Sequence, residues 1–174
     1  TFGEYIPFRL LFPFLSQIVP IADFTSGKDF TLFRDQVHQK SFNTLICFED
    51  SVAHLSREFV QRGSQFFINI TNDAWFQDTK APFLHLQSSV FRAIENRRYV
   101  IRAANTGVSG FINSKGVIEK VISDQAGKLT YISGYAHHAI GLSDTRTWYS
   151  SYADIFSLLA LVLALLIGLR ARAF

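Results

Sequence analysis

Methionine is absent from this sequence of 174 residues, so Thr1 is not a translation start, and we expect the chain to be a fragment or a processed product. There is a single cysteine, Cys47, which excludes an internal disulfide. Charged residues make up 18% of the chain, below the roughly 25% typical of soluble domains. Part of the chain is therefore expected to contact something other than water.

The chain also lacks a large net charge of either sign. The net charge is only +3, and the basic residues are scattered through mixed-sign stretches such as "SREFVQR" and "ENRRYVIR". Nucleic-acid binding usually needs a concentrated basic patch, so we expect no nucleic-acid partner.

Proline is scarce as well, and three of the four prolines lie in the apolar opening at residues 7, 13 and 20. They exclude a long helix there and predict a turn-rich apolar segment. Packing on the core and contact with lipid both remain open for this segment.

From residue 43 onward, alternating hydrophobic patterns predict a parallel sheet with crossover helices. The expected elements are a strand at 43–48, a helix at 51–62, a strand at 64–71, a helix at 83–98, and short strands at 99–104, 108–114 and 117–123. The short strands are separated by the turns "NTG" and "KG", which favour hairpins.

The C-terminal stretch is apolar for long enough to suggest a membrane helix. Residues 155–169 are uncharged, and residues 148–169 provide the roughly 20 residues that one crossing requires. Trp148, Tyr149 and Tyr152 would lie at one interface, and Arg170 and Arg172 at the other. These arginines favour a cytoplasmic C-terminus. The alternative to a membrane helix is a buried core helix at the end of the chain.

Cys47 ends the first predicted strand just before a helix. Functional atoms in parallel sheets gather at this edge, and the N–H groups of the following helix favour a thiolate. Free cysteines are also among the most buried residues, so position alone leaves two readings, a nucleophile and a core side chain.

Several motifs resemble the apolipoprotein N-acyltransferases, the membrane branch of the nitrilase (carbon–nitrogen hydrolase) superfamily. The matching stretches are "FGEYIP" at 2–7, "ICFED" at 46–50, "NDAWF" at 72–76, His85, "RAIENRRYVIRAANTGVSGFI" at 92–112 and the terminal apolar stretch. They occur in the expected order over nearly the whole chain.

The resemblance implies an α/β fold, a partial nitrilase-like αββα sandwich followed by a C-terminal transmembrane helix. Residues 1–147 would form the C-terminal part of the catalytic domain. Residues 148–174 would form the membrane helix and a short basic cytoplasmic tail. The implied location is the bacterial inner membrane, with the catalytic domain on its outer, periplasmic side.

The implied reaction moves a fatty acyl chain from a phospholipid to the α-amino group of a lipid-modified N-terminal cysteine of an apolipoprotein, through a cysteine thioester and without a cofactor. By motif, Cys47 matches the nucleophile, and Glu4 and Glu49 match functionally important carboxylates. A solvated surface carboxylate is the alternative for both. The family's Glu base and its Lys are both expected before Thr1. Neither Lys28 nor Lys40 matches that Lys by motif.

Four further residues are candidates for substrate binding: Phe48, Trp75, Phe76 and His85. Trp75 and Phe76 would contact acyl chains at the membrane edge, although core packing is the alternative for Trp75. Phe48 stands where these enzymes often carry Tyr, and Gln77 stands where a Gly is common, so a hydroxyl donor and a loop hinge differ from the family pattern.

Two other groups of residues have simpler interpretations. Arg92, Glu95 and Arg98 form either a buried polar network or a salt-bridged surface. His137 and His138 are adjacent and have no suitable partner nearby in the sequence, so we expect no metal.

Two alternatives to the acyltransferase remain. One is a nitrilase-type amidase that hydrolyses small amides by the same cysteine chemistry. The other is a catalytically inactive, membrane-anchored remnant of a truncated gene, because two members of the implied triad are not in the sequence.

Overall fold

The computed structural model describes residue 25 and residues 27–171. Contacts divide the chain into two compact units, Thr1–Phe30 and Thr31–Phe174, and every element described below belongs to the second. The proline-rich opening segment and Glu4 lie outside the described residues.

A six-stranded mixed sheet organises the second unit. Its strands are β1 (Phe33–Arg34), β2 (Ser41–Ile46), β3 (Phe66–Asn72), β4 (Tyr99–Asn105), β5 (Gly110–Ile112) and β6 (Ile118–Val121), and they are paired in chain order. The central strands β2, β3 and β4 are parallel, whereas the outer pairs are antiparallel. The predicted parallel sheet and the later hairpins are therefore confirmed.

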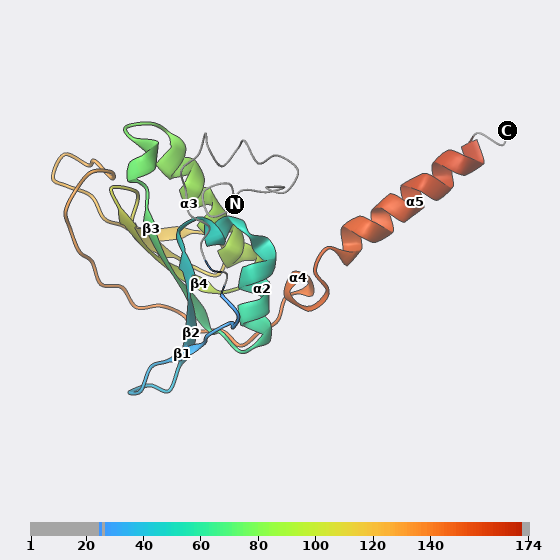
Figure 1. Ribbon diagram of the computed structural model, residues 1–174, viewed down its shortest axis with the longest axis horizontal. Helices are drawn as coiled ribbons and strands as arrows, with labels where there is room; N and C mark the ends of the chain where they lie inside the picture. Colours follow the sequence, from blue (N-terminus) through green and yellow to red (C-terminus); the bar gives the residue numbers. More distant parts are fainter. Residues whose placement is uncertain (1–24, 26, 172–174) are drawn as a thin grey trace. The chain divides into compact units, whose positions relative to one another are not determined.

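Two crossover helices connect the parallel strands. The segment after β2 contains the 3-10 helix η1 (Cys47–Ser51) and α2 (Ala53–Gln61); the segment after β3 contains η2 (Ala74–Phe76) and α3 (Ala81–Asn96). Figure 1 shows α2 and α3 on the same side of the central strands. This is one helix layer on one sheet, as in half of an αββα sandwich; the described residues contain no second sheet.

The face of the sheet under the helices is closed. In each central strand, alternate side chains point to this face, and the apolar ones join helix residues in one buried cluster. The cluster consists of Val60, Phe67, Leu86, Ala93, Val100, Val108 and Ile112. Burial of this apolar face supplies the main favourable term in folding.

The opposite face of the sheet is apolar and partly open. It carries Phe42 and Ile46 of β2, Phe66 and Ile70 of β3, and Ile101 of β4, none of which is buried. Ile46 is 59% exposed and Ile70 is 45% exposed, although both lie in central strands of the sheet. An apolar sheet face of this kind normally packs against a further layer.

Most differences from the predicted elements lie at their ends. The strand β1 was missed because it has only two residues. The helix predicted at 83–98 starts two residues earlier, with Pro82 in its first turn, and ends at Asn96 because Arg97 adopts a left-handed conformation with φ 52°.

The C-terminal stretch differs from the predicted single helix over residues 148–169. It forms α4 (Trp148–Tyr152) and α5 (Ile155–Ala171), separated by Ala153 with φ 52°. Among residues 25 and 27–171, no helix is both long enough and apolar enough to cross a membrane, so the predicted transmembrane helix is not confirmed. Residues 155–169 nevertheless carry no charge and, apart from Ser157, no polar side chain, and all of them are exposed.

Gly110 lies where strand β6 approaches β5 closely. A Cβ at this position would stand 2.4 Å from the backbone carbonyl oxygen of Lys120, which cannot rotate away. We expect Gly110→Ala to lower the free energy of unfolding, measured in urea, by about 2 kcal/mol. The control Gly27→Ala adds a Cβ with no described atom within 4 Å. Equal effects of the two substitutions would contradict this packing.

Candidate active site

Cys47 is the first residue after β2 and the first of η1. Its φ is 52°, in the left-handed region that residues other than glycine rarely adopt. Its side chain is partly exposed rather than sealed in the core. The thiol lies at the carboxyl edge of a parallel sheet, where ligands usually bind. This position favours the interpretation of Cys47 as a nucleophile over that of a core side chain.

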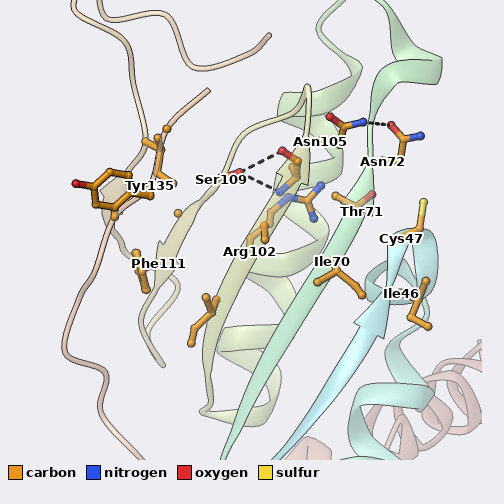
Figure 2. Close-up of a pocket in the computed structure, with 17 residues that line it drawn as sticks. Ile46, Cys47, Ile70, Thr71, Asn72, Arg102, Asn105, Ser109, Phe111 and Tyr135 are labelled. Atoms are coloured by element: carbon orange, nitrogen blue, oxygen red, sulfur yellow. Dashed lines mark hydrogen bonds between the residues drawn. The ribbon is translucent and has the colours of Figure 1, made fainter. Parts of the chain in front are cut away.

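Beside Cys47 lies a pocket of about 730 Å³ on the open face of the sheet. Its floor includes Ile46, Ile70 and Ile101, and its far wall includes Phe111 and Tyr135. Figure 2 shows the Cys47 sulfur at the end of β2, near Thr71 and Asn72 at the end of β3. The mainly apolar lining suits a hydrocarbon chain better than a charged ligand.

Glu49 has a defined partner instead of pointing freely into solvent. Its carboxylate accepts a hydrogen bond of 2.7 Å from the backbone N–H of Ile46, the residue before Cys47. Glu49 thereby closes the turn that carries the thiol. Whether it also contacts substrate stays a prediction, and Glu4 lies outside the described residues.

The predicted substrate-binding residues divide into two groups. Phe48, in η1, and Phe76, in η2, both pack against the ring of His85, at centroid distances of 5.7 and 5.9 Å. Trp75 is 84% exposed, so the alternative of core packing is wrong for it. Substrate contacts of all four residues stay predictions.

His85 is buried on α3, and both of its ring nitrogens are occupied. Nδ1 lies 2.8 Å from a carboxylate oxygen of Asp73, and Nε2 lies 3.0 Å from one of Asp50. Carboxylates only accept hydrogen bonds, so both nitrogens donate and the ring is an imidazolium. His85 thus joins the Cys47 loop, through Asp50, to the loop after β3, through Asp73.

Arg102 completes this cluster from β4. Its guanidinium donates to Asp50 at 2.8 Å and to Asp73 at 3.2 Å, and both carboxylates are fully buried. The four side chains Asp50, Asp73, His85 and Arg102, called here the buried quartet, contain two positive and two negative charges. Such balance is required where water cannot screen a charge.

The pKa values of His85 and Asp73 follow from these contacts. Burial alone would lower the pKa of His85, but its hydrogen bonds to Asp50 and Asp73 outweigh burial and raise the pKa from 6.5 to about 9. Burial would raise the pKa of Asp73, yet the hydrogen bond from His85 and the charge of Arg102 lower it below 3.8. The charges of His85 and Asp73 therefore depend on each other.

Neutral polar side chains add further hydrogen bonds to the quartet, although the buried Nε of Arg102 has no partner among the described residues. Ser89 donates to Asp50 at 2.5 Å, and Thr71 donates to Asp73 at 3.0 Å. Asn69 accepts from Arg102 at 2.6 Å. All three residues are buried. Because their side chains are uncharged, they extend the network without adding a charge.

Arg92, Glu95 and Arg98 form buried contacts rather than a surface ladder. Arg92 is buried, pairs with Glu95 at 2.8 Å and donates to the carbonyl oxygen of Asp50 at 3.2 Å. Arg98 lies beyond the end of α3 and binds backbone carbonyl oxygens, including that of Thr145 at 2.7 Å. The buried alternative is therefore correct, but the three residues do not share one helix face.

His138 contacts Glu119 at 2.9 Å, beside Tyr99 and Asn113, which also donate to that carboxylate. Hydrogen bonds from Tyr99, Asn113 and His138 lower the pKa of Glu119 to about 2. These contacts attach the extended segment around residue 138 to strands β4 and β6. In the described part of the chain, no group of three or more His, Cys, Asp or Glu side chains is placed to hold a metal ion.

The sequence interpretation missed Asp50, Asp73 and Arg102. One signal was available: Arg102 is the only charged residue in the otherwise apolar strand "YVIRAA". A charged side chain in a buried strand requires a buried counter-charge. The sequence does not show which carboxylates provide this counter-charge, because Asp50 follows β2 and Asp73 follows β3, whereas Arg102 lies in β4.

Residues 7–148 match the model of the carbon–nitrogen hydrolase family. This match extends over most of the chain. The chain belongs to the carbon–nitrogen hydrolase family. The resemblance seen in its motifs is thereby confirmed at the level of the family.

Among carbon–nitrogen hydrolases, the chain is similar to several curated apolipoprotein N-acyltransferases. It is 36% identical over 157 residues to that of Geobacter metallireducens, covering 90% of this chain and 29% of the relative. It is 32% identical over 163 residues to that of Thermotoga maritima, covering 94% and 31%. The chain thus spans about three tenths of the length of these relatives.

Solved structures in the same superfamily are more distant. A mutant of the amidase from Nesterenkonia sp. AN1, with an acetamide moiety attached to its active-site cysteine, aligns with a TM-score of 0.47 at 17% identity. The alignment covers 59% of this chain and 40% of the amidase. This likeness is too slight to support conclusions about chemistry.

The raised pKa of His85 has a measurable effect on stability. A raised pKa means that the stabilisation is complete below pH 6.5 and is lost as the pH rises to about 9. We expect the free energy of unfolding to fall by on the order of 3 kcal/mol across this range. In His85→Gln, denaturant unfolding should show no such fall. A wild-type stability that stays constant over the same range would contradict the assignment.

Proposed function

We propose that the protein is an N-acyltransferase with a cysteine nucleophile. It would move a fatty acyl chain from a phospholipid to the α-amino group of the N-terminal diacylglyceryl-cysteine of apolipoproteins. The observation that supports this most is the position of Cys47, which lies partly exposed in a left-handed turn beside an apolar pocket. The relatives named as apolipoprotein N-acyltransferases support the same reaction.

The reaction proceeds in two steps at the sulfur of Cys47. In the first, a base takes the proton of the Cys47 thiol, and the thiolate attacks the ester carbonyl carbon of the phospholipid. A C–S bond forms, the C–O bond breaks, and the base returns the proton to the departing oxygen, so that the lysophospholipid leaves as an alcohol. In the second, the amine of the apolipoprotein attacks the thioester; a C–N bond forms, the C–S bond breaks, and the amine's proton returns to the thiol. The products are the acylated lipoprotein and free Cys47.

An ordinary thiol is only a few per cent ionised at neutral pH, so this chemistry needs a base and a group that stabilises the oxyanion. The family resemblance assigns these roles to a Glu and a Lys, and neither Lys28 nor Lys40 matches that Lys by motif. Within the chain, Glu49 would hold the turn of Cys47, and Glu4 would orient the Lys or the incoming amine. No cofactor is needed for either step.

Substrate binding would use the apolar side chains around the turn. Phe48 and Trp75 are exposed near the ends of β2 and β3, where they would meet the acyl chain. Phe76 would support the same surface from η2. His85 is buried with both nitrogens occupied, so it would contribute by supporting the rings of Phe48 and Phe76.

We also propose that α5 contacts lipid. Its exposed side chains from Ile155 to Leu169 include no charged residue, and such a surface is rarely left in water. Contact with the bacterial inner membrane would bring the site to its phospholipid donor. The periplasmic placement of the catalytic domain and the cytoplasmic C-terminus remain predictions.

Thioester formation tests the proposed reaction. In cells that produce the protein and receive an alkyne-labelled palmitate, we expect a labelled protein whose label hydroxylamine releases. The variant Cys47→Ala should lose the label, because no other thiol exists in the chain. The control Ser123→Ala, at an exposed position, should keep it. Full labelling of Cys47→Ala, or ammonia release from small amides without any label, would contradict the proposal and favour the amidase alternative.

Liposome flotation tests the lipid contact of α5. We expect the protein to float with phosphatidylethanolamine and phosphatidylglycerol vesicles. Replacing both Leu161 and Leu165 by Lys should reduce the bound fraction about tenfold or more, because charged side chains are costly in hydrocarbon. Replacing the same two residues by Ala preserves the helix and should cause a smaller loss. Equal flotation of the two double variants would rule out this contact.

A further inference from the structure

The main chain of Cys47 is held by a side chain from the neighbouring strand. The amide Nδ2 of Asn69, on β3, donates to the carbonyl oxygen of Cys47 at 3.1 Å and to that of Leu45 at 3.2 Å. One buried amide group therefore spans the end of β2 where the backbone turns into η1. A left-handed residue other than glycine persists only when its surroundings hold it, and these two bonds supply such a restraint.

The orientation of the Asn69 amide is fixed by Arg102. The Oδ1 atom of Asn69 accepts from the Nη1 of Arg102 at 2.6 Å. A flipped amide would direct its NH₂ group at a guanidinium, and two donors cannot bond to each other. The oxygen must therefore face Arg102, which directs Nδ2 toward Cys47.

Arg102 itself is held by several acceptors. The same Nη1 donates to Asp50 at 2.8 Å and to Ser89 at 3.0 Å, and Nη2 donates to Asp73 at 3.2 Å. Asp50 lies in η1, three residues after Cys47. The turn of Cys47 is thus attached to one guanidinium at both ends, directly through Asp50 and indirectly through Asn69.

We propose that Asn69 is a positioning residue for Cys47, holding its main chain in the left-handed conformation that places the sulfur at the pocket. The proposal rests on the proposed function in one respect, that Cys47 is the nucleophile. Asn69 would not touch substrate, because it is fully buried. It acts by transmitting the fixed position of Arg102 to the carbonyl oxygen of Cys47.

The chain contains a matched control in Asn43. It is also an asparagine, fully buried, on the same face of the adjacent strand β2. Its Oδ1 accepts from the hydroxyl of Ser64 at 2.7 Å, and none of its described hydrogen bonds reaches residues 45–47. Loss of this side chain should weaken the fold without changing the turn of Cys47.

Because Cys47 is the only cysteine, protein labelled with ¹³C at cysteine gives one carbonyl and one Cα resonance that report on this turn. The variants to compare are Asn69→Asp, Asn69→Ser and Asn43→Ala. Asp keeps an oxygen for Arg102 but loses the donor; Ser keeps a small polar group that is too short to reach Cys47. Denaturant unfolding of each variant measures its stability separately.

We expect both Asn69 variants to shift the two Cys47 resonances and Asn43→Ala to leave them at the wild-type positions despite its lower stability. If one Asn69 variant does not fold, the other decides. Unchanged Cys47 resonances in the folded Asn69 variants would overturn the proposal. Equal shifts in Asn43→Ala would also overturn it, because general loosening would then explain the effect. Neither measurement depends on acyl transfer, so failure of the thioester experiment is a separate outcome.

Discussion

The structure depends most on a charge-balanced group of four buried side chains. Asp50, Asp73, His85 and Arg102 come from two strand-end loops, a crossover helix and a strand, and each charge has a partner of opposite sign. Removing one member would leave an unpaired buried charge, which typically costs about 3–5 kcal/mol. The quartet therefore favours the packing of the parallel strands and α3 that brings all four side chains together.

This constraint connects the two faces of the sheet. On the closed face, the quartet lies beside an apolar core formed with the helices. On the open face, apolar side chains line a pocket whose rim carries Cys47. Cys47 stands at the boundary, because its turn is bonded to the closed face through Asn69 while its sulfur lies at the pocket. A rigid, charged interior thereby positions a thiol next to a space suited to a hydrocarbon chain.

Sequence patterns were sufficient for the parallel strands, both crossover helices and the strand-end position of Cys47, because each depends on local periodicity. They were insufficient for the quartet, because Asp50 and Arg102 are far apart in the chain and meet only in the fold. The interpretation of Glu49 also required coordinates, since its bond to the Ile46 N–H leaves no mark on composition. The single helix expected over residues 148–169 failed for a local reason, the left-handed conformation of Ala153, which hydropathy does not detect.

The protonation state of His85 tests the central claim most directly. Protein labelled with ¹⁵N at histidine reports the charge of each ring by NMR as the pH is varied. We expect both ring nitrogens of His85 to carry protons at pH 7 and to remain so until the pH approaches about 9, since two carboxylates accept from them. A neutral His85 ring with one protonated nitrogen at pH 7 would contradict the balanced quartet and the positioning of Cys47 built on it.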